Sequence, residues 1–88
     1  MVITVTHNDN TVFKYDNFDE IANNVNVIII DCSNNKLSSL PPNMMFPNLT
    51  HFVCSYNNLY YIPPHINCYI EKDEKTKHPE YMRRKLLI

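Results

Sequence analysis

The side chains best suited to chemistry in this chain are three cysteines and four histidines. Cys32 and Cys54 lie 22 positions apart, and Cys68 follows. Paired thiols can form a disulfide, or bind zinc together with histidine. The histidines are His7, His51, His65 and His78. No two of them have the H-x-x-x-H spacing, so we expect no metal site and predict that the cysteines are small buried hydrophobic residues.

Other catalytic arrangements also lack support in the sequence. No local motif combines serine, histidine and aspartate, or cysteine and histidine, and the chain has no glycine from which to build a phosphate-binding loop. With 88 residues the chain forms one domain with a small core. We therefore expect a protein that is not an enzyme and that carries no cofactor.

Charge and targeting signals restrict the partner and the compartment. The net charge of −1 gives no reason to expect nucleic acid or an anionic membrane as partner. The first residues, MVITVTHNDN, do not resemble a secretory signal, and no apolar run approaches the length of a membrane helix. An odd number of cysteines favours reduced thiols, so we expect an intracellular protein, cytoplasmic or nuclear. Codon-driven abundance of Asn, Ile, Lys and Tyr suggests an AT-rich genome, such as that of a protist or a large DNA virus.

Half of the chain consists of one pattern that occurs twice. VIIIDCSNNKLSSLPP (27–42) and LTHFVCSYNNLYYIPP (49–64) share their apolar spacing, one cysteine, one asparagine and a Pro-Pro ending. Within each copy, two apolar residues two apart place both side chains on the same face of a strand. Asn35 and Asn57 follow these strands, where an amide can satisfy backbone groups of the turning chain.

The shared frame resembles the leucine-rich repeat, L-x-x-L-x-L-x-x-N-x-L-x-x-L-P. The resemblance implies an α/β-type leucine-rich repeat solenoid with a short parallel curved sheet, a mostly irregular convex side, an N-terminal β-hairpin and a short C-terminal helix. It also implies that the concave strand face binds a protein partner. Stacking of the copies predicts that Ile29 lies beside His51 and Asp31 beside Val53. The expected partner-binding residues are Ile29, Asp31, Ser33, His51, Val53, Ser55 and Tyr56, and the expected structural residues are Asn35, Asn57, Cys32 and Cys54.

The remaining segments are expected to cover the ends of the repeats within a single domain, 1–88. Residues 1–26 form an N-terminal hairpin and cap, with one helical turn in FDEIA, and residues 27–70 hold two full repeats and a partial third strand. Residues 71–88 form a C-terminal cap helix or a tail. Arg83, Arg84 and Lys85 either complement the dipole of that helix or act as a targeting signal or phosphate contact.

These features predict a protein–protein interaction module without catalytic activity. The alternative is a structural subunit that self-assembles as a homo-oligomer, for example a homodimer. The sequence does not identify the partner.

Overall fold

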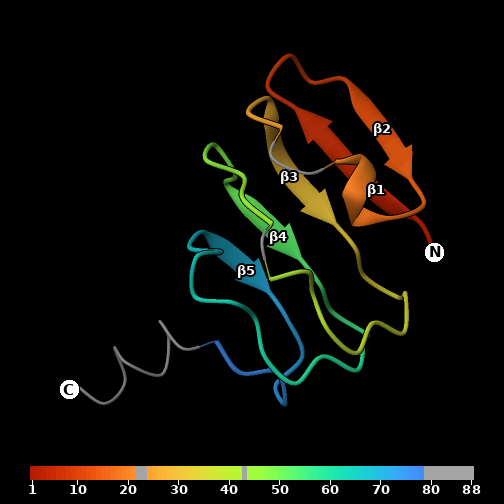
Figure 1. Ribbon diagram of the computed structural model, residues 1–88, viewed down its shortest axis with the longest axis vertical. Helices are drawn as coiled ribbons and strands as arrows, with labels where there is room; N and C mark the ends of the chain where they lie inside the picture. Colours follow the sequence, from red (N-terminus) through yellow and green to blue (C-terminus); the bar gives the residue numbers. More distant parts are fainter. Residues whose placement is uncertain (22–23, 43, 79–88) are drawn as a thin grey trace.

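The computed structural model describes residues 1–21, 24–42 and 44–78. These residues form one five-stranded sheet whose spatial order is β2-β1-β3-β4-β5 (Figure 1). The sheet is mixed, because β1 pairs antiparallel with both β2 and β3, whereas β3, β4 and β5 are parallel. The strands are β1 (Ile3–His7), β2 (Val12–Tyr15), β3 (Val27–Asp31), β4 (His51–Val53) and β5 (Tyr69–Glu71).

Residues 8–11 join β1 to β2, and His7 and Thr11 close a three-residue loop between them. The Asn10 amide donates to the His7 carbonyl and the His7 amide donates to the Thr11 carbonyl, both at 2.9 Å. Asn10 has a φ of 71°, the left-handed conformation that such loops place at their third residue. Asparagine tolerates this conformation better than other residues except glycine, which the chain lacks. The polar HNDN segment therefore forms the hairpin turn.

The two copies of the repeated pattern stack in register. Ile29 pairs with His51 and Asp31 with Val53, so the expected neighbours are confirmed at a spacing of 22 residues. Backbone bonds continue past the strands, since the Cys32 amide donates to the Val53 carbonyl at 2.8 Å. β5 joins β4 at the shorter spacing of 18 residues, with His51 opposite Tyr69.

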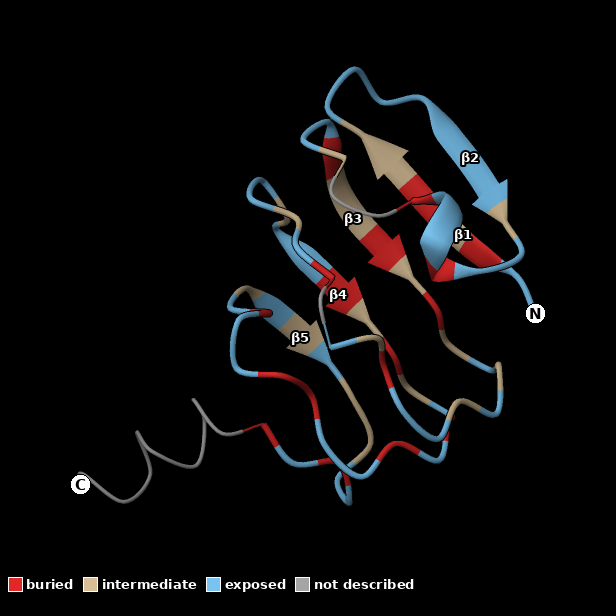
Figure 2. Cartoon of the chain, in the orientation of Figure 1, coloured by how far each residue is buried: buried red, intermediate tan, exposed pale blue. Residues whose placement is uncertain are grey.

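The core lies between one face of the sheet and the segments that return from the end of one strand to the start of the next (Figure 2). Fully buried side chains from the three central strands include Val5, Ile30 and Phe52. Leu40, Met44, Leu59 and Ile62 cover them from the returning segments. Because alternate strand residues point to opposite faces, the other face of the sheet is left open to solvent.

The predicted fold class, an α/β-type leucine-rich repeat solenoid with a short parallel curved sheet, is wrong. Two of the four strand pairings are antiparallel, and the described residues contain a single helical segment, the 3-10 turn η1 (Phe18–Glu20). Helix is scarce because the returning segments carry Pro41-Pro42 and Pro63-Pro64, which oppose it. The helix expected near the C-terminus, with Arg83, Arg84 and Lys85, lies outside the described residues.

Candidate functional site

The open face of the sheet, opposite the core, presents two rows of side chains and is called here the outer face. The first row follows the strand register across four strands and contains Thr6, Ile29, His51 and Tyr69. His51 and Tyr69 are exposed and their ring centroids lie 5.3 Å apart. An aliphatic and two aromatic side chains are therefore contiguous on three neighbouring strands.

The second row lies two residues away from the first along each strand, and it contains charged side chains. It contains Thr4, Asp31, Val53 and Glu71 in register. Val53 thus sits between two carboxylates. Asp31 is oriented by Ser33, whose backbone amide and hydroxyl donate to Asp31 Oδ1 at 3.0 and 2.6 Å. The face combines an apolar centre with an acidic margin.

Hydrogen bonds hold the ring of His51 in place. The Thr50 hydroxyl donates its hydrogen to the Ile28 carbonyl at 2.9 Å, and its oxygen lies 2.9 Å from His51 Nδ1. Because a hydroxyl has one hydrogen, the contact with His51 requires that Nδ1–H donates and the Thr50 oxygen accepts. This assigns the tautomer of the neutral ring and leaves its Nε2 as the acceptor.

Tyr56 extends this surface just beyond β4, in an unusual backbone conformation. Its side chain is 74% exposed and its φ is 59°. Asn34, the residue at the same place in the first copy, has the same φ. Asparagine suits a left-handed conformation, whereas a bulky aromatic residue does not. The Tyr56 amide donates to Asp73 Oδ1 at 2.9 Å, which helps to fix the turn.

Asn57 is the structural residue that links the two copies. Its Oδ1 accepts from the amides of Asn35 and Leu37 at 3.0 and 2.9 Å. Its Nδ2 donates to the carbonyls of Cys32 and Cys54 at 3.0 Å each, and to that of Ser55 at 3.3 Å. The side chain is buried, so these bonds satisfy backbone groups that solvent does not reach.

Asn35 and Asp73 continue the same arrangement on either side of Asn57. The Asn35 amide side chain accepts from the backbone N–H of Val2 at 3.0 Å and donates to its carbonyl at 2.8 Å. Asp73 accepts from the amides of Tyr56 and Asn57 at 2.9 and 3.1 Å, and these two bonds lower the pKa of its carboxyl group. We call the series Asn35, Asn57 and Asp73 the side-chain ladder.

Cys32 and Cys54 are buried, free thiols. Each donates weakly to a carbonyl of the next strand, Cys32 to Val53 and Cys54 to Glu71, at 3.4 Å. Burial raises the pKa of Cys54 to about 12, and burial, followed by the nearby Cys54, raises the pKa of Cys32. The thiolate is the nucleophile and the metal ligand, and burial disfavours this form of both side chains. Within residues 1–21, 24–42 and 44–78, no cluster of three or more metal-ligating side chains occurs.

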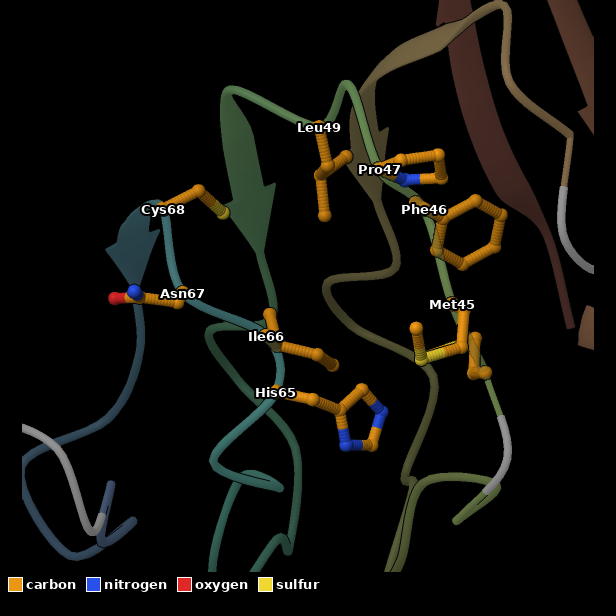
Figure 3. Close-up of a pocket in the computed structure, with 9 residues that line it drawn as sticks. Met45, Phe46, Pro47, Leu49, His65, Ile66, Asn67 and Cys68 are labelled. Atoms are coloured by element: carbon orange, nitrogen blue, oxygen red, sulfur yellow. The ribbon is translucent and has the colours of Figure 1, made fainter.

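A cavity of about 150 Å³ opens between the segment before β4 and the segment before β5 (Figure 3). Met44, Phe46, Leu49 and Ile66 are among the apolar residues that line it. Its origin lies in the length of the returning segments. Twelve positions separate Leu40 from Phe52, whereas eight separate Ile62 from Ile70, so the last segment has fewer residues with which to fill the core.

Comparison with known proteins adds no relatives. No family model, curated protein or solved structure matches this chain. In the described part of the chain, no helix has the length and apolar character needed to span a membrane.

The sequence prediction missed four residues of the outer face, Thr4 and Thr6 on β1 and Tyr69 and Glu71 on β5. The alternation of Ile66, Cys68 and Ile70 contained the signal for the two on β5, because residues between inward-facing ones point outward. Of the predicted set, Ile29, His51, Asp31 and Val53 are brought together by the register. Ser33, Ser55 and Tyr56 follow directly at the ends of the same strands.

Proposed function

We propose that this chain is a non-catalytic module that binds a protein partner through the outer face of β3, β4 and β5. The contiguous row of Ile29, His51 and Tyr69 carries the proposal. Interfaces between proteins are enriched in aromatic residues at their centre and in polar residues at their margin. The exposed Tyr56 and the carboxylates of Asp31 and Glu71 supply such a margin.

The same reasoning supports two accompanying proposals. The chain acts inside the cell, in the cytoplasm or nucleus, because its three cysteines are free thiols, two of them fully buried. Its two copies are related to the leucine-rich repeat family, because the apolar positions, cysteine and asparagine recur at a spacing of 22 residues and the strands of the two copies pair at that same spacing. Neither proposal requires catalysis, a cofactor, nucleic acid or a membrane.

Affinity capture from the native cell tests the binding proposal. Ile29→Asp and Val53→Lys place charge in the two rows, and each is expected to abolish capture of the partner while the melting temperature changes little. The lysine introduced at position 53 would lie between the carboxylates of Asp31 and Glu71, so it would not add a like charge. Val25→Asp is the matched control, because Val25 is 55% exposed but precedes β3 and is not on its outer face. Capture that survives both outer-face substitutions, with the protein folded, would contradict the proposal.

A further inference from the structure

The hairpin strand β2 forms an open edge of the sheet and exposes apolar side chains. β2 pairs only with β1 among the described strands, and its other edge is unpaired. Val12 is 58% and Phe13 is 42% exposed, and Figure 2 shows β2 as exposed over most of its length. Exposed strand edges with apolar residues are sites at which another strand adds to a sheet.

The hairpin turn shows which backbone groups of β2 are free. His7 donates to the Thr11 carbonyl, so this pair is hydrogen-bonded across the hairpin. Hydrogen-bonded and non-hydrogen-bonded pairs alternate along an antiparallel ladder. After the bonded pair His7–Thr11, the pair Thr6–Val12 is therefore non-bonded and the pair Val5–Phe13 is bonded. The N–H and C=O groups of Phe13 point toward β1. Those of Val12 and Lys14 point outward, with no described strand to receive them.

We infer that β2 pairs antiparallel with β2 of a second copy of this chain, about a two-fold axis that passes through Phe13. In this register the outward N–H and C=O groups of Val12 form two hydrogen bonds with those of Lys14 in the second copy. The two-fold axis repeats this pair, so the interface contains four hydrogen bonds between backbone groups. Phe13 faces its own counterpart as a non-hydrogen-bonded pair, the kind in which side chains approach most closely. Two aromatic rings then meet on the core side of the sheet, next to His7, whose ring centroid is 4.6 Å from that of Phe13.

Charge and backbone conformation select this register over its neighbours. An axis through Lys14 would place two lysines directly opposite each other, which is destabilising. An axis through Val12 would bring Asn10, with its left-handed backbone, into the ladder. With the axis at Phe13, each Lys14 lies opposite Val12 of the second copy, and its aliphatic stem covers that side chain.

The opposite edge of the sheet is less suited to pairing. Tyr69 donates to the Thr50 carbonyl and Glu71 accepts from the Cys54 amide, so both residues turn their backbone groups toward β4. Within the three residues of β5, Ile70 alone points its backbone groups outward. A two-fold pairing there would form half as many bonds as pairing through β2.

The dimer is independent of partner binding and leaves the outer face open. A two-fold axis perpendicular to the sheet keeps the outer faces of both copies on the same side. The result is a continuous ten-strand sheet with two copies of the Ile29, His51 and Tyr69 row, which would bind a repeated or dimeric partner more tightly than one copy does.

Sedimentation of the full chain over a range of concentrations tests the inference. The wild-type protein is expected to form dimers, and Lys14→Pro is expected to weaken them by roughly tenfold or more, because two bonds between the copies lose their donor. Proline is compatible with this position of the hairpin, since the N–H that it removes points away from β1. Lys14→Thr, which retains the N–H, is the matched control and should still dimerise.

Disulfide trapping gives a second readout that does not depend on the proline variant. In a Cys68→Ser background, Phe13→Cys should form a covalent dimer under mild oxidation, because non-bonded partners lie about 4.5 Å apart at Cα, within disulfide range. Val12→Cys, which faces Lys14, should not. A wild-type chain that stays monomeric up to its solubility limit would overturn the inference. So would a dimer that neither Lys14→Pro nor Phe13→Cys affects as described.

Discussion

The side chain of Asn57 holds two successive turns of the chain together. It is buried and bonds five backbone groups, including the amide of Leu37 and the carbonyl of Cys32. Asn57→Ala removes every one of these bonds, and each buried group left unpaired costs about 1–3 kcal/mol. We expect the free energy of unfolding to fall by roughly 3 kcal/mol or more, measured by urea denaturation. Asn58→Ala, an exposed neighbour, should change it by less than about 0.5 kcal/mol.

Asp73 makes the stability of the protein sensitive to acid. Hydrogen bonds from Tyr56 and Asn57 lower the pKa of its carboxyl group below the ordinary 3.8. The folded state therefore binds this proton less readily than the unfolded state, and the stabilisation is present above pH 3.8 and is lost as pH falls through the folded pKa. Unfolding free energy measured against pH should show a shallower acid slope in Asp73→Asn than in the wild type.

Two residues control that measurement. Asp9, whose pKa is lowered by the hydroxyl and amide of Thr11, should preserve part of the acid slope in Asp73→Asn. Asp19→Asn, which changes an exposed aspartate in η1, is the charge-matched comparison. An Asp73→Asn protein with an unchanged slope would show that the ladder carboxylate does not contribute to acid sensitivity.

Tyr56 is expected to lower stability in exchange for a binding surface. A left-handed backbone costs about 1–2 kcal/mol for most residues and less for asparagine. Tyr56→Asn should therefore raise the free energy of unfolding by part of that amount, while it weakens capture of the partner. Lys36→Asn provides the comparison, because Lys36 also has a positive φ, 57°, but is outside the proposed binding set. Lys36→Asn should raise the free energy of unfolding and leave capture of the partner unchanged. If Tyr56→Asn lowered the free energy of unfolding, the left-handed conformation of Tyr56 would not be a source of instability.

At the scale of elements, sequence periodicity predicted the strands but not all of their pairings. The hairpin and the in-register pairing of β3 with β4 follow from alternation and from the shared asparagine and apolar spacing. The antiparallel pairing of β1 with β3 leaves no local signal, because it depends on contacts between distant segments, and this pairing makes the sheet mixed. The resemblance to a repeat family therefore gave a correct local stacking and a wrong fold class.

The candidate site was predictable to the same extent. Outward residues of β3 and β4 follow from alternation, but the third member of the ladder does not. Asparagine lies four residues after the ends of β3 and β4, whereas Asp73 lies two residues after the end of β5 and is a different residue type. The left-handed Tyr56 was also hidden, since tyrosine gives no sign of that conformation.

The short segment before β5 leaves the cavity of about 150 Å³ partly unfilled. The Cys68 side chain lines it and is half-buried, whereas Asn67 points away from the other lining side chains in Figure 3. Cys68→Leu should fill apolar space and raise the free energy of unfolding by about 0.5–2 kcal/mol, the usual range for such changes. Asn67→Leu adds a similar side chain that points away from the other lining side chains and should not. A destabilised Cys68→Leu would mean that the cavity walls cannot accept the added volume.

At the scale of the whole molecule, the sheet and ladder connect the N-terminal hairpin to the last strand. Asn35 bonds Val2, Asn57 bonds Asn35, and Asp73 bonds Asn57, so no strand between β1 and β5 can leave without breaking its neighbours' bonds. A chain of this size has a single small core, and its units do not pack independently. We therefore expect the hairpin and the parallel strands to unfold together.

Phe52 tests this cooperativity, because it is the largest of the fully buried side chains and lies on β4, far from the hairpin along the chain. Phe52→Ala should lower the free energy of unfolding by about 3–5 kcal/mol, a large part of what a small domain possesses. Native-state hydrogen exchange should then show the same loss of protection at the amides of β1 as at those of β4. If the β1 amides kept their wild-type protection, the hairpin would be a separate folding unit and the ladder would not couple it to the parallel strands.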